Sequence, residues 1–407
     1  MIKNNKLSSQ NLILFLFISF PITFLIGSLL INLYLLLITI CLLVAFKEII
    51  IPFVNEEKKI LFIMLFYLFF LIINLIFSDN WIQSLPRVSK FLLIFGQIIA
   101  FKFILKNSDH VKYLYKTWVI IFLIVFFDII FEIIIGNNIF GNKAIIPGRI
   151  SSFSGDDMNI GHFFSAFVLI ALSYFHYKYQ NNTLNSILAL GFIIVSFLIG
   201  ERANFIKTFI IISIFSFYSI KINIKYFLVS VASLILFAII TLNINQNYKL
   251  RYINQISNIW NKGITHYLDN SVYGSHFKVA EKIFKENFLF GVGIKNFRIS
   301  SFDEKYEIDH RFKDWRGNTH PHQIHYELLS ETGIVGYISF WILIILSLIL
   351  VFKGSKQKIN LYQLSGLLFV LINLLPLIPS GSFFSTFSSG LFWLNYALMI
   401  GYTKKLK

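Results

Sequence analysis

Charged residues are scarce in this 407-residue sequence. Lys, Arg, Asp and Glu make up 14% of it, whereas soluble proteins carry about 25%. Hydrophobic residues make up 56%, and the mean hydropathy is +0.71. This composition excludes an ordinary soluble enzyme and predicts a membrane protein. Uncharged runs recur that are long enough, or nearly so, to cross a hydrocarbon core of about 30 Å as helices, whereas a barrel would show short alternating segments.

Cysteine and internal repeats are also nearly absent. The single Cys41 lies inside a hydrophobic run and cannot form a disulfide within the chain. Secondary transporters usually show two related halves, and no repeat is visible here. Acidic residues number only 20 against 36 Lys and Arg, which gives a net charge of +16. Half of the positive charge follows membrane topology rather than a basic soluble face, which argues against nucleic-acid binding.

Twelve hydrophobic runs predict an all-α polytopic membrane protein with about twelve transmembrane helices. They occupy residues 11–27, 28–46, 60–77, 88–105, 117–135, 158–177, 185–200, 204–220, 226–243, 327–352, 360–378 and 385–402. The first run is interpreted as a span rather than a signal peptide, because no small-residue cleavage site follows it. Residues 1–243 would hold nine spans, residues 244–326 one large loop, and residues 327–407 three spans.

Lys and Arg are distributed unevenly between the two sides that these spans define. One side holds Lys3, Lys6, Lys47, Lys58, Lys59, Lys102, Lys106, Lys112, Lys116, Lys178, Lys221, Lys225, Lys353, Lys356, Lys358, Lys404, Lys405 and Lys407. The opposite short loops and span ends hold only Arg87, Lys90, Lys143, Arg149, Arg202 and Lys207. The remainder lie in the large loop, which the positive-inside rule does not govern. Both termini are therefore predicted to be cytoplasmic, with the large loop outside.

The large loop contains a predicted amphipathic helix at residues 274–288. Its apolar side consists of Phe277, Val279, Ala280, Ile283, Phe284 and Asn287, and its charged side of Lys278, Glu281, Lys282, Lys285 and Glu286. We expect this helix to lie along the membrane surface. The next stretch, LFGVGIKNF, contains Gly291 and Gly293 but has Asn296 where a dinucleotide fingerprint needs glycine, so we predict a tight turn.

Three histidines fall within six residues in HPHQIHYELLSETGIVGY, residues 320–337. If residues 322–337 form one continuous helix, Gly333 lies at nearly the azimuth of His322 and about 16 Å further along the axis. Gly336 follows one turn later. This stripe predicts a groove for a neighbouring helix or for a thin prenyl chain below the imidazole. Plain helix packing through the two glycines is the alternative, and the pattern leaves both open.

A metal site is a further interpretation of the histidines. His320, His322 and His325 would supply ligands together with Asp309 or His310. The stretch lacks the His-x-x-x-His spacing on one helix face, and no thiolate is near. We therefore predict no metal and no cofactor. We expect His325 to lie on a helix surface, and Glu327 and Glu331 to be solvated.

The pattern of His322 and Gln323, nine residues, Gly333, two residues and Gly336 resembles the signature of the O-antigen ligase and O-antigen polymerase superfamily. Three other stretches are similar to that family: PGRISSFSGDDMN at residues 147–159, LIGERANF at residues 198–205, and LFGVGIKNF at residues 289–297. Together they cover roughly residues 145–340, within a twelve-span layout similar to that of the family.

The resemblance implies a GT-C-type glycosyltransferase of lipopolysaccharide or surface-polysaccharide biosynthesis. It would take glycan from an undecaprenyl-diphosphate-linked donor at the periplasmic face of the bacterial inner membrane. His322 matches the family's base and Arg202 its diphosphate-binding arginine, although the residue pattern also fits an ion pair of Arg202 with Glu201. The family's second arginine is missing at the start of the loop helix. The candidates for its role are Arg149, His276, Lys278 and Arg298.

Two classes of function stay open from the sequence. The first is glycan transfer, either by a ligase that uses lipid A-core as acceptor or by a polymerase that extends the glycan itself. The second is a flippase or transporter for lipid-linked sugars. A transporter predicts charges in the middle of spans, and the clearest ones here are Asp128 and Glu132. Their rarity and the missing repeat favour glycan transfer.

Overall fold

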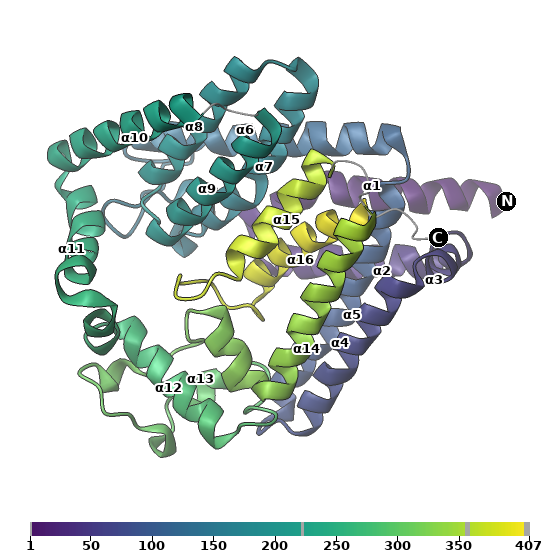
Figure 1. The fold of residues 1–407 in the computed structure, drawn as a ribbon. Coiled ribbons are helices and arrows are strands. Elements are labelled where there is room, and N and C mark those ends of the chain that lie inside the picture. Colours follow the sequence, from purple (N-terminus) through teal and green to yellow (C-terminus); the bar gives the residue numbers. More distant parts are fainter. Residues whose placement is uncertain (1, 221–223, 355–358, 403–407) are drawn as a thin grey trace.

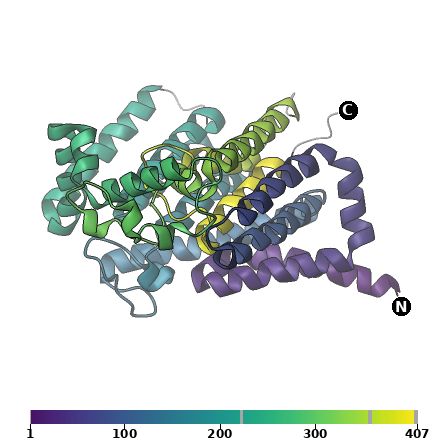
Figure 2. The same cartoon turned by 90° about the horizontal axis from the view of Figure 1, so that it is seen from below.

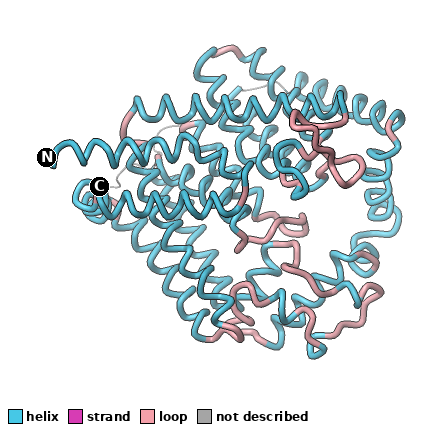
Figure 3. The backbone as a smooth tube through the Cα atoms, turned by 180° about the vertical axis from the view of Figure 1, so that it is seen from behind, coloured by secondary structure: helices cyan, strands magenta, loops and turns pink. Residues whose placement is uncertain are grey.

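The computed structural model describes residues 2–220, 224–354 and 359–402. Six of the lysines predicted to be cytoplasmic lie outside these residues: Lys221, Lys356, Lys358, Lys404, Lys405 and Lys407. The described residues form helices joined by loops and contain no strand (Figures 1 and 3). This confirms the all-α class.

The helices follow one another along the chain with few long interruptions. They are α1 (Ile2–Ile26), α2 (Ser28–Val44), α3 (Ile51–Glu56), α4 (Lys58–Ile76), α5 (Trp81–Ile104), α6 (Ser108–Ile135), α7 (Ile160–Tyr179), α8 (Asn182–Leu198), α9 (Arg202–Phe215), α10 (Ile224–Ile244), α11 (Gln246–Asp269), α12 (Val272–Glu286), α13 (Phe297–Ser300), α14 (Ile324–Gly354), α15 (Leu361–Asn373) and α16 (Thr386–Gly401). Short helical segments are η1 (Phe46–Ile50), η2 (Ser152–Asp157), η3 (Ser216–Ile220), η4 (Glu304–Tyr306) and η5 (Lys313–Trp315).

Each of the twelve predicted spans coincides with a helix, but fewer meet a strict test for crossing a membrane. By length and apolar composition, six segments of the described residues qualify: Ser9–Ile26, Lys58–Ile76, Ser108–Ile135, Ile160–Tyr179, Phe227–Ile244 and Ile324–Lys353. A seventh is formed if α2 and the segment Phe46–Glu56, bent by 86°, are one span. The chain is thus a multi-pass membrane protein, and the number of twelve spans stays a prediction.

A single large hydrophobic core joins the N-terminal helices to the last two helices. Trp118 of α6 stacks on Phe101 of α5 and donates its indole N–H to the Phe17 carbonyl of α1 at 2.7 Å. Trp393 of α16 and Phe91 of α5 meet edge to face. In Figure 1, α15 and α16 lie in the middle of the molecule. This packing fixes the loop between α15 and α16 at the centre, next to the start of α14.

Helices α10 and α11 form an arm at one edge of the molecule, and α12 returns from it towards α14 (Figures 1 and 2). The predicted amphipathic helix is confirmed as α12, including the pair Glu281 and Lys285 at 2.6 Å. Its apolar side packs against α14. Three of its residues also form a small core with residues that follow α12, and this core consists of Val279, Ala280, Ile283, Val292, Phe297, Tyr306 and Ile308. Protein therefore covers this apolar side, and the position of α12 along the membrane surface stays a prediction.

The predicted continuous helix over residues 322–337 is also wrong. Helix α14 begins at Ile324, after His322, and Gly333 interrupts it with φ 62° and ψ −170°. A Cβ at Gly333 would collide with the backbone of Leu289, and the chain of residues 288–293 fills the break. The helix axis is thus broken between His322 and Gly336, so no straight glycine stripe runs below His322.

Four backbone hydrogen bonds hold this junction, which we call the α14 seam (residues 288–293 against residues 330–335). The amides of Ile334 and Val335 donate to the carbonyls of Phe288 and Leu289 at 2.9 and 3.2 Å. The amides of Val292 and Gly293 donate to the carbonyls of Ser330 and Glu331 at 3.0 and 2.9 Å. Gly291, Gly293 and Gly333 therefore allow close backbone contact between the two segments of the α14 seam.

Candidate functional site

Four aromatic rings from two segments of the chain meet at His322. Its ring centroid lies 4.1 Å from that of His320, 5.3 Å from His276 and 5.4 Å from Tyr273. His276 and Tyr273 come from the first turns of α12, whereas His320 and His322 lie in the loop before α14. The packing of α12 against α14 thus brings together histidines about 45 positions apart in the sequence.

The backbone holds His322 in a conformation that side chains rarely adopt. Its φ is +58°, in the left-handed region, and its carbonyl accepts a hydrogen bond from the Ser380 amide at 2.8 Å. Burial, together with the adjacent His320 and His276, lowers the pKa of His322 to about 3. The imidazole is therefore neutral at pH 7 and able to accept a proton. Strained backbone of this kind is concentrated at functional sites.

His325 differs from His322 in its partners. The His325 ring interacts through both nitrogens, one with the Leu374 carbonyl at 2.9 Å and the other with the Tyr337 hydroxyl at 3.1 Å. It also stacks on Trp341. Within the described part of the chain, the His322 ring lies against three other rings and its nitrogens form no hydrogen bond. His325 thus fastens helices together, whereas the His322 nitrogens remain available.

Three arginines gather at the junction of α8, α9 and α11. Arg202, the first residue of α9, donates to the Arg251 carbonyl at 2.8 Å, and Arg251 donates to the Gly200 carbonyl at 3.0 Å. Burial and then the nearby charges of Arg149 and Arg202 lower the pKa of Arg251. We call Arg149, Arg202 and Arg251 the arginine triad. Like charges this close need an anion to compensate them.

The last turn of α8 explains why Arg251 lies there. A helix ends with carbonyls that lack partners within the helix. Tyr252 and Tyr248 of α11 donate hydroxyl hydrogen bonds to the carbonyls of Phe197 and Leu198 at 2.7 and 2.5 Å. Together with the Arg251 bond to Gly200, these contacts cap α8 with side chains of α11. The start of α11 is thereby fixed against the site.

Glu201 orients the triad from inside the protein. Its carboxylate pairs with Arg149 at 3.1 Å and accepts hydrogen bonds from the Gly161 amide at 3.1 Å and from the Asn204 side chain. Burial raises the pKa of Glu201, and the charge of Arg149 opposes this rise. The predicted alternative of an ion pair between Arg202 and Glu201 is not what forms, because Glu201 binds Arg149 instead.

The loop that carries Arg149 is anchored by the two acidic residues near the end of α6. Glu132 accepts hydrogen bonds from the amides of Ser151 and Ser152 at 3.0 and 2.6 Å. Asp128 accepts one from the Ser152 hydroxyl at 2.5 Å. These carboxylates are satisfied by the loop itself. Asp128 and Glu132 thus hold the loop in place, whereas a charge in a transport pathway would face the transported molecule.

A cavity lies between the start of α7, the start of α14, helices α15 and α16, and the loop that joins these two helices. It measures about 400 Å³ including its mouth, and it is lined by His162, Ile324, Phe369, Asn373, Ser380, Gly381, Phe383, Ser388, Leu391 and Phe392. His162, near the start of α7, is within electrostatic range of Arg149 and Lys207 on one side and of His320 on the other. Lys207 donates to Asn373 at 3.0 Å. We call this space the central cavity.

The remaining predicted residues are placed at different positions. His276 is buried beside His322, and its ring interacts with the Trp315 carbonyl at 3.0 Å. Lys278 forms an ion pair with Asp269 at 2.8 Å on the surface. Arg298 lies near Arg87 rather than near the arginine triad. Of the four candidates for the second arginine's role, only Arg149 belongs to the triad.

Gln323 caps the helix that follows it. Its side-chain carbonyl accepts hydrogen bonds from the amides of His325 and Tyr326 at 2.7 and 3.1 Å. This is the interaction expected at a helix N-terminus, where the first amides lack partners. Gln323 thus fixes the start of α14 directly after His322.

The expectation that Glu327 and Glu331 are solvated is wrong. Both side chains are 0% exposed. Glu327 accepts hydrogen bonds from the Ser382 hydroxyl at 2.5 Å and the Phe383 amide at 2.7 Å. Glu331 accepts one from the Lys295 amide at 2.8 Å. They tie α14 to the loop before α16 and to the segment after α12.

The histidine rings stack beside one another and do not converge on a point. Within residues 2–220, 224–354 and 359–402, no three His, Cys, Asp or Glu side chains are arranged to hold a metal ion. The absence of a metal remains a prediction to be tested with chelators.

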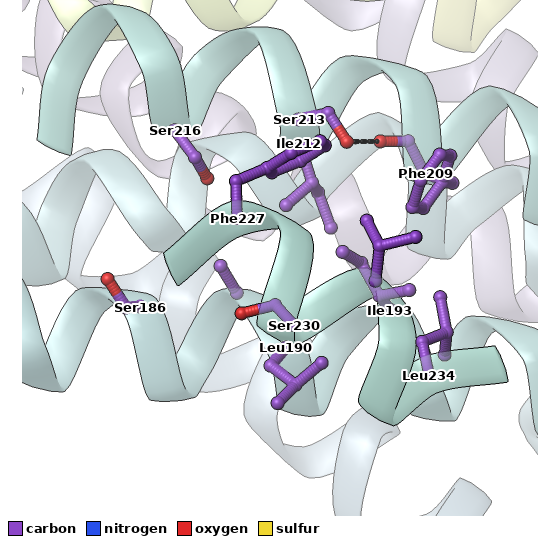
Figure 4. Close-up of a pocket in the computed structure, with 12 residues that line it drawn as sticks. Ser186, Leu190, Ile193, Phe209, Ile212, Ser213, Ser216, Phe227, Ser230 and Leu234 are labelled. Carbon is purple, nitrogen blue, oxygen red and sulfur yellow. Dashed lines mark hydrogen bonds between the residues drawn. The ribbon is translucent and has the colours of Figure 1, made fainter. Parts of the chain in front are cut away.

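A second groove lies between α8, α9 and α10 and is mostly apolar (Figure 4). It is lined by Ser186, Ala189, Leu190, Ile193, Phe209, Ile212, Ser213, Ser216, Phe227, Ser230, Val231 and Leu234. Ser213 donates its hydroxyl to the Phe209 carbonyl within its own helix at 2.7 Å. No charged residue lines this groove, so it is not the place for reactions of ionic groups.

Sequence reasoning missed several residues of the site. Arg251 has no motif around it, and only its neighbours Tyr248 and Tyr252, one helical turn apart, hint at a packed face. His162 and Tyr273 carry no signal either. For Lys207 a signal existed, because it is one of the few cations on the predicted outer side. Glu201 was considered only as a partner of Arg202.

The fold and the site together define a multi-pass helical membrane protein with a cluster of buried histidines, a group of three arginines and a cavity at the start of α14. Residues 184–341 match the family model described as O-antigen ligase. This match confirms the predicted resemblance to the O-antigen ligase superfamily over a region that contains Arg202, Arg251, His276 and His322. No curated protein matches the chain.

Proposed function

We propose that this protein transfers a glycan from an undecaprenyl-diphosphate-linked donor to a hydroxyl group of an acceptor. The observation that carries the proposal is the arginine triad together with a buried His322 whose ring nitrogens form no hydrogen bond among the described residues. His162, which lines the central cavity, is within electrostatic range of both Arg149 and His320. The family match supports the same chemistry. The donor, its lipid and the side of the membrane are part of the proposal.

His322 acts as the general base in this proposal. The acceptor oxygen attacks the anomeric carbon of the donor sugar and gives its proton to the imidazole. At the same time the bond between that carbon and the diphosphate oxygen breaks, and the diphosphate leaves with the electron pair. A base with a low pKa in the free protein is suitable if the bound diphosphate raises it, because a nearby anion stabilises the imidazolium.

The arginine triad binds the diphosphate. Three guanidinium groups and the carboxylate of Glu201 give a formal net charge of about +2, which matches the charge of a diphosphate diester. The Arg149 side chain has a buried Nε without a hydrogen-bond partner among the described residues. Paired N–H donors fit phosphate oxygens and stabilise the charge that develops as the diphosphate leaves. His162 and Lys207 would line the path between the two groups.

The experiment is a transfer assay with purified protein in lipid nanodiscs. His322→Ala should abolish transfer while donor binding is kept, because losing the proton acceptor leaves the diphosphate contacts intact. His325→Ala and His320→Ala should retain a substantial fraction of the activity. If His322→Ala stayed active while His325→Ala lost activity, the assignment of the base would be wrong.

Ligase and polymerase are distinguished by complementation. We expect a ligase that moves the glycan to lipid A-core in the bacterial inner membrane, with cytoplasmic termini and a periplasmic site. Expressed in a ligase-deficient strain, the protein should restore the lipopolysaccharide ladder. Restoration only in a polymerase-deficient strain would identify an O-antigen polymerase instead.

A further inference from the structure

A second group of cations, separate from the arginine triad, lies near His320. It consists of Arg87 and Lys90 of α5 and of Lys295 and Arg298 after α12, and we call it the α5 cation cluster. Arg87 is within electrostatic range of Arg298, and Lys90 is within range of both Arg87 and Lys295. The two pairs are separated by about two hundred residues in the sequence, so the fold brings them together.

Lys90 is the least compensated member of this cluster. Its side chain is only 7% exposed, and its ammonium group has no hydrogen-bond partner among the described residues. Arg298 likewise has a buried Nε without a partner. Lys102, a buried lysine three turns further along the same helix, pairs with Glu57 at 3.3 Å. Helix α5 thus buries Lys102 beside a carboxylate and Lys90 without one.

The carboxylates near the cluster are already engaged. Lys295 donates to the Ser382 hydroxyl at 2.5 Å and lies 4.0 Å from Glu327, which binds Ser382 and a backbone amide. Glu331 accepts hydrogen bonds from the amides of Lys295 and Phe297. Four cations against two carboxylates leave a formal excess of about +2. A buried excess charge is unfavourable unless an anion pairs with it.

The position of the cluster indicates which anion it binds. His320 is within electrostatic range of Lys295 and Arg298 of the cluster and of His162, which is itself within range of Arg149. In the proposed function the reacting atoms lie at His322, whose ring centroid is 4.1 Å from that of His320. If the donor diphosphate occupies the arginine triad, a second anionic group beyond His322 belongs to the acceptor.

We propose that the α5 cation cluster binds a phosphate group of the acceptor lipid and so holds the acceptor hydroxyl against His322. This rests on the proposed transfer function. A phosphate monoester carries about −1.5 to −2 charges at pH 7 and several acceptor oxygens, which suits the charge and the free donors of the cluster.

The test uses the full-length protein in nanodiscs with saturating donor. Two acceptors are compared, a phosphorylated lipid A-core and the same glycolipid after phosphatase treatment. Lys90→Met should raise the KM for the phosphorylated acceptor about tenfold, which corresponds to the loss of one charged contact. It should leave the KM for the donor within twofold. With the phosphatase-treated acceptor, the variant and the wild type should have equal KM values.

Further variants separate this role from a structural one. Arg298→Gln, on a half-buried side chain, should show the same selective effect if Lys90→Met fails to fold. Lys313→Gln is the control, because Lys313 is 52% exposed and pairs with Glu307 on the surface. Equal losses with both acceptors would overturn the proposal. So would a rise in the KM for the donor, which would assign the cluster to the diphosphate.

Failure of the proposed function can be recognised separately. If the wild type transferred no glycan, binding of the two glycolipids to wild-type and Lys90→Met protein would be measured directly. Tighter binding of the phosphorylated form, lost in the variant, would sustain the phosphate site without transfer. Equal binding of both forms would overturn it.

Discussion

The α14 seam makes Gly333→Ala the most informative substitution for the fold of the site. Gly333 has φ 62° and ψ −170°, a conformation that costs a residue with a Cβ about 1 to 3 kcal/mol. The new Cβ would also collide with the Leu289 carbonyl and push residues 288–293 away. Loss of the four seam hydrogen bonds, at about 0.5 to 1.5 kcal/mol each, would add about 2 to 6 kcal/mol.

The expected destabilisation is therefore about 3 to 9 kcal/mol, a large part of the total of about 5 to 15 kcal/mol for folded proteins. The control is Gly191→Ala in α8, where a Cβ meets nothing within 4 Å and the helical conformation suits alanine. The assay is thermal unfolding in detergent followed by size-exclusion chromatography, together with glycan transfer. Gly333→Ala should lose both stability and activity. If its unfolding midpoint equalled that of Gly191→Ala, the seam would not hold α12 against α14.

Three further predictions concern the chemistry of the site. Arg251→Lys should lower transfer at least tenfold although the charge is kept, because the N–H donor to the Gly200 carbonyl and the paired donors to phosphate are lost; a wild-type rate would remove Arg251 from the triad. The pKa of His322 is lowered to about 3, below the unfolded value of about 6.5, so stability should decrease as pH falls from 6.5 towards 3. The value of kcat/KM reports the free protein and should therefore stay high below pH 6. The decrease in kcat on acidification should occur at a higher pH, because the bound diphosphate raises the pKa of His322. A decrease in kcat/KM centred at pH 6.5 would contradict the burial of His322. Transfer should persist in excess EDTA, and a loss reversed by one divalent ion would indicate a metal site.

The helices were predictable from the sequence because each hydrophobic run is long and bounded by polar residues. The break in α14 was not, since a glycine inside an apolar run is compatible with both a continuous and an interrupted helix. What decides is the backbone of residues 288–293, which lies some forty positions earlier in the chain. The same holds for α12, whose amphipathic pattern predicts a covered face without indicating whether lipid or protein covers it.

The site was predictable only where a motif marked it. His322 and Arg202 belong to recognisable stretches, and the structure places His322 against His276 and His320, and Arg202 against Arg251. Arg251 could not be found, because its position depends on α11 capping the end of α8. Glu327 and Glu331 were misjudged because their partners are distant in the sequence. Glu327 binds the loop before α16, more than fifty residues later, and Glu331 binds the segment after α12, more than thirty residues earlier. Contacts between distant segments decided each of these outcomes.

The topology pattern nevertheless contained information about the site. Among the predicted short outer loops and span ends, only six cations remain, and such positions normally carry little positive charge. Lys143 is exposed in the loop after α6. The other five belong to the groups described above: Arg149 and Arg202 to the arginine triad, Lys207 to the surroundings of His162, and Arg87 and Lys90 to the α5 cation cluster. A cation retained where orientation disfavours it requires a local reason, and the two anionic groups in the proposals above would provide one. On those proposals, the exceptions to the charge rule coincide with the anion-binding groups.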